Sequence, residues 1–159
     1  MGATLHDQFM WEAIDLSRQN VRDGRGGPFA AVIVKDGSVI ARGTNLVTST
    51  NDPTAHAEIV AIREACRTLG SFQLDGCEIY TSCEPCPMCL GALYWARPRG
   101  IYFANTRDDA AEIGFDDRAI YDEFVRPHSD RKIPMIQVLR DEALVAFHEW
   151  QAKNDKVPY

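Results

Sequence analysis

Residues 78–96 read EIYTSCEPCPMCLGALYWA. The β-rich run Glu78–Ser82 predicts a strand, and the apolar segment Pro87–Ala96 predicts a helix that stops before Pro98. Pro87 fits just inside a helix start, because the N–H groups of a first turn have no partners within the helix in any case. The stretch therefore predicts a strand that passes through a cysteine-rich turn into a helix.

The sequence on either side continues this alternation of helices and strands. Apolar residues at helical spacing predict a first helix over Leu5–Val21, which ends before the glycine-rich segment 24–28. Asp36-Gly37 predicts a tight turn between the strands Phe29–Val34 and Ser38–Thr44. The other expected elements are a polar loop over Thr48–Thr54, a helix over His56–Leu69, a strand over Ile101–Ala104, a helix over Arg118–Val125, a strand over Ile136–Leu139 and a helix over Ala143–Lys153.

The order of these elements predicts the fold class. An antiparallel hairpin followed by right-handed crossovers gives a mixed sheet with helices on both faces, which is an α/β architecture. The chain has 159 residues, the usual length of one domain, so residues 1–159 are expected to form a single domain.

Charge and composition limit the classes of partner. The net charge is −6 and the basic residues are scattered, which disfavours binding of a long nucleic acid and favours a small, largely uncharged substrate. The N-terminal sequence has no apolar signal core, and no run of apolar residues is long enough for a membrane span. We therefore expect a cytoplasmic protein, in which cysteines serve as metal ligands or packing residues rather than in disulfides.

Two of the predicted helix starts carry residues that suit a metal ion. Cys86 and Cys89 are three positions apart, so on a first helical turn their side chains point the same way. The positive end of the helix dipole favours the thiolate, which is the form that binds zinc. With His56 the two cysteines would make a Cys₂His site, which leaves a fourth tetrahedral position for water as catalytic zinc sites do.

Glu58 lies two residues after His56, an offset of about 200° on a regular helix. The two side chains therefore face one cavity only if His56 caps the helix with non-helical dihedrals. A carboxylate in that place, outside the ligand set, takes the proton of the zinc-bound water and passes it to the substrate.

His-x-Glu followed by Pro-Cys-x-x-Cys resembles the signature of the zinc-dependent nucleobase and nucleoside deaminases. Here it reads His56-Ala57-Glu58 and Pro85-Cys86-Pro87-Met88-Cys89. The resemblance implies a hydrolytic deaminase with one zinc ion per chain. It also implies the cytidine deaminase-like fold, three α/β/α layers around a mixed five-stranded sheet.

Within that superfamily, the chain resembles the bacterial guanine deaminases over nearly its whole length. The implied catalytic residues are Glu58 and Asp117, the latter as a second acid that moves protons at the amine. The implied substrate-binding residues are Phe29 and Trp95 on the faces of the purine, Asn45, Ala57, and Tyr159, which closes the pocket. The likeness rests on the stretches Gly26-Gly27-Pro28-Phe29, residues 51–58 (NDPTAHAE), residues 80–89 (YTSCEPCPMC) and Gly114-Phe115-Asp116-Asp117.

The reaction implied by this resemblance converts guanine and water to xanthine and ammonia. A zinc-bound hydroxide attacks C2, and Glu58 carries the proton first to N3 and then, together with Asp117, to the leaving amine. Members of the group are homodimers, and some exchange their C-terminal segments. Guanosine, adenosine, cytosine and cytidine remain alternative substrates at this stage.

Other interpretations of the same residues stay open. Cys86 and Cys89 could form a redox pair, and Cys83 could complete a closed Cys₃His site in a non-catalytic zinc module. Without the resemblance, Asp117 would be interpreted as a helix cap and Asn45 as a turn residue. Likewise Tyr159 would be a frayed terminus, and Phe29 and Trp95 core aromatics.

Overall fold

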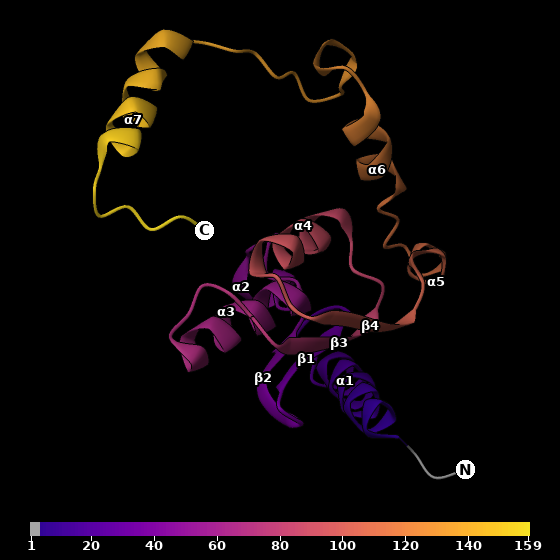
Figure 1. The fold of residues 1–159 in the computed structure, drawn as a ribbon. Coiled ribbons are helices and arrows are strands. Elements are labelled where there is room, and N and C mark those ends of the chain that lie inside the picture. The colour runs from indigo at the N-terminus through magenta and orange to yellow at the C-terminus, as the bar shows by residue number, and fades with distance from the viewer. Residues whose placement is uncertain (1–3) are drawn as a thin grey trace. The chain divides into compact units, whose positions relative to one another are not determined.

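The computed structural model describes residues 4–159, which form two compact units. The N-terminal unit ends at Asp117, and the C-terminal unit comprises Arg118–Tyr159 (Figure 1). The expectation of a single domain over residues 1–159 stays a prediction. Within residues 4–159, no helix combines the length and the apolar character needed to cross a bilayer.

The N-terminal unit is built on a mixed sheet of four strands in the order β2-β1-β3-β4. Strand β1 pairs antiparallel with β2 and with β3, whereas β3 and β4 run parallel. The hairpin and both later strands confirm the sequence prediction to within a residue at each end. The strands span Ala30–Lys35 (β1), Ser38–Thr44 (β2), Cys77–Cys83 (β3) and Gly100–Asn105 (β4).

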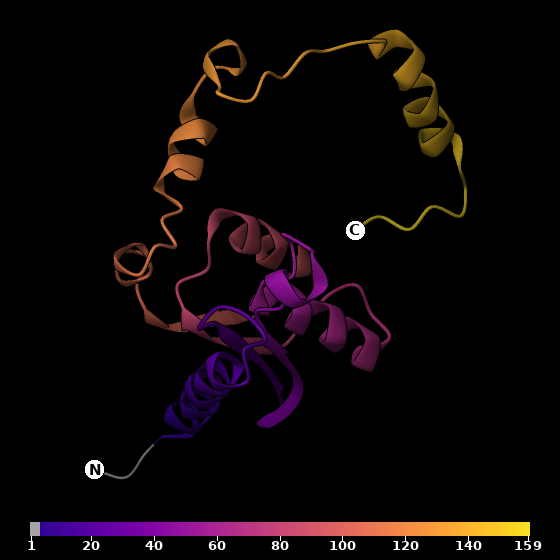
Figure 2. The same cartoon turned by 180° about the vertical axis from the view of Figure 1, so that it is seen from behind.

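Helices cover both faces of this sheet (Figures 1 and 2). On one face, Phe9 and Ala13 of α1 (Leu5–Arg22) pack against Val32 and Tyr80. On the other face, α3 (Ala57–Leu69) and α4 (Pro87–Ala96) pack against the alternate residues of the same strands. The three-layer α/β/α fold is thereby confirmed.

The prediction of five strands is wrong for the described chain. Residues 136–139, expected as the fifth strand, have no strand structure and lie in the C-terminal unit. An extended segment becomes a strand only when a neighbouring backbone pairs with it, and no strand occurs between residues 118 and 159. The apolar pattern of this segment therefore did not indicate a strand within its own unit.

Two short helices of the N-terminal unit were not predicted. Helix α2 (Val47–Thr50) occupies the expected polar loop, and α5 (Arg107–Glu112) follows β4. Both have fewer than two turns, too few to produce a visible apolar periodicity. Thr106 nevertheless caps α5 in a capping box with Asp109, a signal that the sequence contained.

The C-terminal unit contains α6 (Arg118–Val125), the 3-10 helix η1 (His128–Asp130) and α7 (Arg140–Ala152). The prediction of α6 is confirmed, and α7 begins three residues earlier than expected. None of these three helices buries a side chain within the C-terminal unit itself. Ile120, Phe124 and Phe147 are among many large apolar residues of this unit that stay exposed.

A glycine sets the distance between the sheet and the start of α3. A Cβ atom on Gly43 of β2 would lie 2.1 Å from the carbonyl oxygen of Ala57 and 2.6 Å from the backbone nitrogen of Ala61. Backbone atoms cannot yield as a flexible side chain can, so only glycine permits this approach. The end of β2 is thus held directly against the N-terminal turn of α3.

We expect Gly43→Ala to push α3 away from the sheet and to lower the free energy of unfolding by about 1–3 kcal/mol, as overpacked core positions do. Gly91→Ala is the matched control. Gly91 lies in α4 with open space around it, so alanine there should raise stability by roughly 0.5–1 kcal/mol. Urea unfolding followed by circular dichroism measures both, and an unchanged Gly43→Ala protein would contradict the close approach.

Candidate metal centre and active site

His56 and Cys86 are both N-cap residues. His56 precedes α3 with φ −67° and ψ 155°, and Cys86 precedes α4 with φ −64° and ψ 168°. Both backbones are therefore extended rather than helical. The offset of Glu58 from His56 on a regular helix thus does not apply, and the expectation that His56 acts as a cap is confirmed.

The two helix starts bring three ligand atoms together. Nδ1 of His56 lies 3.5 Å from Sγ of Cys86 and 3.5 Å from Sγ of Cys89. Among residues 4–159, these three form a group whose ligand atoms all lie within 4.8 Å of one another. Two thiol sulfurs and one imidazole nitrogen are the donors that zinc prefers, and three of them leave one coordination position open. The residues present therefore fit a catalytic zinc ion.

The Cys86 thiol is prepared to act as a ligand. A hydrogen bond from the Cys89 thiol, helped by the adjacent His56, lowers the pKa of Cys86 to about 4 despite its partial burial. The hydrogen bond with Cys86 in turn raises the pKa of His56. Since the thiolate is the form that binds metal, Cys86 is ready to coordinate at neutral pH.

Glu58 lies beside the three ligands without belonging to their group. Its side chain is buried, with 6% of the residue exposed, and its Oε2 lies 3.4 Å from Sγ of Cys89. Burial raises the pKa of Glu58, because the charged carboxylate loses its hydration. A carboxyl group with a raised pKa next to a metal centre is well placed to accept a proton and release it again.

Cys83 does not join the metal group. Its thiol lies 3.5 Å from the carbonyl oxygen of Thr106 as a hydrogen-bond donor. Burial raises the pKa of Cys83 to about 11, so it remains a thiol at neutral pH. The closed Cys₃His site therefore lacks its fourth ligand. The close approach of His56 to both Cys86 and Cys89 also does not suit a simple redox pair.

Three of the expected substrate-binding residues lie near the start of α3. Ala57 is the first residue of α3 and is fully buried. Asn45 follows β2 and is 7% exposed, and the N–H of its neighbour Leu46 donates to the carbonyl of Ala55, the residue before His56. Phe29, which precedes β1, is half-buried and accepts a hydrogen bond at its carbonyl from the N–H of Asn45.

One aromatic residue near this group was missed in the sequence analysis. The ring of Phe115 meets the ring of Phe29 edge to face, with 4.9 Å between centroids and 89° between planes. Phe115 stands in the stretch Gly114–Asp117 that the sequence analysis quoted without giving Phe115 a role. The stretch itself was the available signal.

The remaining expected site residues differ in their surroundings. Asp117 is half-buried, and its pKa is raised first by burial and then by the negative charge of Cys86, which places it within electrostatic reach of the metal group. Trp95 lies on α4 with 65% of its surface exposed. Tyr159 belongs to the C-terminal unit and is 72% exposed. The binding roles of Trp95 and Tyr159 stay predictions.

Comparison with known proteins places this geometry in a family. The sequence profile described as the cytidine and deoxycytidylate deaminase zinc-binding region matches residues 3–105, which include all three candidate ligands and Glu58. The chain belongs to this family of zinc-dependent deaminases. The zinc-binding deaminase family and the hydrolytic reaction class expected from the sequence are thereby confirmed.

Among the deaminases of this family, guanine deaminase of Bacillus subtilis strain 168 is 54% identical over 97% of this chain and 99% of its own. Its X-ray structure superposes with a TM-score of 0.95 at 55% identity, over 97% of this chain and 98% of its own. Guanine deaminase of Nitrosomonas europaea has a TM-score of 0.67 at 35% identity, over 96% of this chain and 87% of its own. A tRNA-specific adenosine deaminase of Aquifex aeolicus is 48% identical over 48% of this chain and 51% of its own.

The deaminase site makes a direct prediction about zinc content. We expect Cys86→Ser and Cys89→Ser proteins to lose their zinc on dialysis, since each loses one of only three protein ligands. Cys83→Ser should retain one zinc ion per chain, because the Cys83 thiol is hydrogen-bonded to Thr106 and lies outside the metal group. Elemental analysis by mass spectrometry measures the zinc content. Loss of zinc from Cys83→Ser would contradict the open site and favour the closed Cys₃His site.

Proposed function

We propose that this deaminase hydrolyses guanine to xanthine and ammonia. The observation that carries the proposal is the extent of the likeness to Bacillus subtilis guanine deaminase, which covers 97% of this chain and 99% of that protein. The likeness to the Aquifex aeolicus tRNA-specific adenosine deaminase covers 77 residues, about half of either chain. A net charge of −6 also suits a small purine better than a tRNA.

Zinc held by His56, Cys86 and Cys89 would lower the pKa of a coordinated water to about 7 and so supply hydroxide at neutral pH. Glu58, buried beside these residues, is proposed to hold a proton and to deliver it to N3 of the purine ring. Burial raises the pKa of Glu58, which favours the protonated form and so helps the carboxyl group to hold a proton.

Ammonia leaves only after the amine has been protonated. Glu58 is proposed to move this second proton from the hydroxyl group formed at C2 to the amine, assisted by Asp117. Asp117 suits the task because it is half-buried, its pKa is raised and it lies within electrostatic reach of Cys86.

Binding of the base is assigned to residues around the start of α3 and to two exposed aromatics. Asn45 is proposed to hydrogen-bond to the base, and Ala57 to contact it through the first turn of α3. Phe29 and Trp95 are proposed to cover the purine faces, and Tyr159 to close the pocket over it. Buried hydrogen-bonding groups of this kind reject a base that leaves them unpaired, which gives the pocket its specificity.

The test of this proposal is a Glu58→Gln variant assayed with guanine. Glutamine keeps the shape of the side chain but carries no transferable proton, so kcat should fall by about 10²- to 10⁴-fold. Zinc content and melting temperature should remain near those of the wild type, because Glu58 lies outside the metal group.

Glu64→Gln is the matched control. It alters a half-buried carboxylate of the same helix, paired with Arg67 at 2.7 Å, and should leave guanine turnover unchanged. Full activity in Glu58→Gln would contradict the mechanism, and an inactive wild type would contradict the proposed function.

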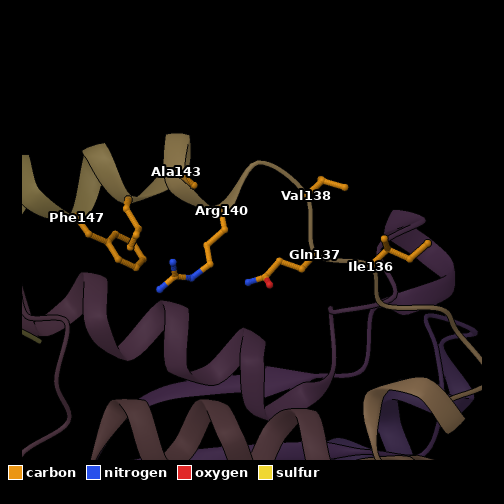
Figure 3. A pocket seen from close by; sticks show the side chains of 7 residues that line it. Ile136, Gln137, Val138, Arg140, Ala143 and Phe147 are labelled. Carbon is orange, nitrogen blue, oxygen red and sulfur yellow. The ribbon is translucent and has the colours of Figure 1, made fainter.

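We further propose that the enzyme is a homodimer in which the C-terminal units are exchanged between subunits. The helices of residues 118–159 bury no side chain within their own unit, although they carry many large apolar side chains. A pocket of this unit is lined mainly by apolar groups, and in Figure 3 the side chains of Phe147, Arg140 and Gln137 point to the same side. Apolar surface of this extent is characteristic of an interface.

The N-terminal unit offers apolar surface of its own. Tyr94 and Trp95 of α4 and Phe103 of β4 are among its exposed aromatic residues. A second copy of the chain presents the same two apolar surfaces. In a closed dimer, the C-terminal unit of each chain can therefore cover the apolar surface on the N-terminal unit of the other. The proposal also includes a cytoplasmic location. All five cysteines are free, and two of them, Cys86 and Cys89, are candidate ligands that must stay reduced to bind metal, as they do in a reducing compartment.

Mixed dimers test the exchange. The Glu58→Gln variant and a variant that lacks Tyr159 should each be inactive alone. In an exchanged dimer with one chain of each variant, one of the two sites combines an intact Glu58 with an intact Tyr159 from the partner. Random refolding of an equal mixture should therefore restore roughly a quarter of wild-type activity. Light scattering should give twice the mass of 17.8 kDa for the wild type. A dimer without restored activity would contradict the exchange, and a monomer would contradict the dimer as well.

A further inference from the structure

Asn20 is a buried polar residue of α1 that has no place in the chemistry described so far. It is 2% exposed and lies near the C-terminal end of the helix. Its Nδ2 donates two hydrogen bonds, one to the carbonyl oxygen of Gly27 and one to that of Asn45, both at 2.9 Å. The two carbonyls come from loops 18 residues apart in sequence, so one side chain ties both loops to α1.

The two loops are in direct backbone contact at this point. A Cβ atom on Gly26 would lie 2.1 Å from the carbonyl oxygen of Asn45 and 3.0 Å from its Oδ1. A side chain at position 26 would thus displace Asn45 itself. The glycine and the amide of Asn20 together determine where the backbone of Asn45 lies.

The side chain of Asn45 is also fixed in orientation. Its Oδ1 faces two backbone N–H groups, those of Gly27 at 3.4 Å and Val47 at 3.3 Å. Both of these groups are donors, so the oxygen of the amide must point toward them. None of the hydrogen bonds seen within residues 4–159 uses Nδ2 of Asn45. Asn45 therefore has an N–H donor available, and the backbone N–H of its neighbour Leu46 bonds to Ala55, the residue before the candidate ligand His56.

We propose that Asn20 is a positioning residue for the base-binding amide of Asn45, which reads a hydrogen-bond acceptor of the purine through Nδ2. This inference rests on the proposed function, because it takes the base as the group that Asn45 meets. Among residues 4–159, Oδ1 of Asn20 is buried without a hydrogen-bond partner. An apolar residue would avoid the cost of that unpaired oxygen, but it could not hold the two carbonyls.

A double-mutant cycle tests whether Asn20 acts through Asn45. Asn45→Ala and Asn20→Leu should each raise KM for guanine roughly five- to tenfold, the effect of losing or misplacing one buried hydrogen bond. The change in kcat should be smaller, because neither variant touches Glu58 or the metal ligands. The KM of the double variant should match that of Asn45→Ala within about twofold. Once the Asn45 side chain is removed, Asn20 has no amide left to position.

Purine analogues supply a readout that a purely structural role would not alter. 7-Deazaguanine lacks the acceptor N7, and 2-aminopurine lacks the acceptor O6. The wild type should discriminate against the analogue that lacks the acceptor read by Asn45. This discrimination should shrink in both Asn45→Ala and Asn20→Leu, because the donor is absent in one and misplaced in the other.

Ser17→Ala is the matched control within α1. Ser17 is also a buried polar residue, but its hydroxyl donates to the carbonyl of Ile14 at 2.7 Å and so serves the helix alone. We expect its substitution to leave KM for guanine and the analogue preference unchanged. If Asn20→Leu fails to fold, Asn20→Ser takes its place, because a serine hydroxyl has a single proton and cannot donate to both carbonyls.

The outcomes separate this inference from the proposed function. A wild type that releases no xanthine from guanine overturns both. An active wild type with additive effects in the cycle, or with unchanged KM and analogue preference in the Asn20 variant, overturns the positioning role alone. Non-additive KM effects together with reduced discrimination between analogues support it.

Discussion

The site depends on one packing constraint, which is that the first turns of α3 and α4 meet over the same face of the sheet. Small side chains permit this, because Ala57, Ala61 and Ala65 of α3 share a core cluster with Leu93 and Ala96 of α4. Gly43 brings the sheet against the same turn of α3. Once the two helix starts are in place, the cap residues and the first turn of α4 supply the three candidate metal ligands without any further segment of the chain.

The same constraint separates the role of Glu58 from that of its neighbours. His56 caps α3 with an extended backbone, whereas Glu58 lies inside the first turn and is buried next to Cys89. Binding of metal and transfer of protons are thus assigned to residues two positions apart. The backbone N–H of Leu46, the neighbour of Asn45, bonds to the carbonyl of Ala55, so the loop that carries the candidate base-binding amide is tied to the segment just before His56.

Local spacing made much of this predictable from the sequence. The hairpin, the strand before Pro87, the capping role of His56 and the Cys86/Cys89 pair all follow from residues a few positions apart. The fifth strand was wrong because Ile136–Leu139 has the pattern of a strand without a pairing partner in its own unit. The roles of Phe115 and Asn20 were not predicted. Phe115 contacts Phe29, which is 86 positions away, and Asn20 bonds to Asn45, which is 25 positions away, and no short-range pattern indicates such contacts.

The most direct test of the central claim is a comparison of substrates with the purified, zinc-containing wild type. Guanine, guanosine, adenine, adenosine, cytosine and cytidine would be incubated separately, with ammonia and the product base measured by chromatography. Xanthine from guanine, with little product from the others, is the result that our account predicts. A preference for guanosine or adenosine would leave the roles of His56, Glu58, Cys86 and Cys89 intact but contradict the assignment of the base pocket, and the absence of ammonia from all six would contradict the proposed function.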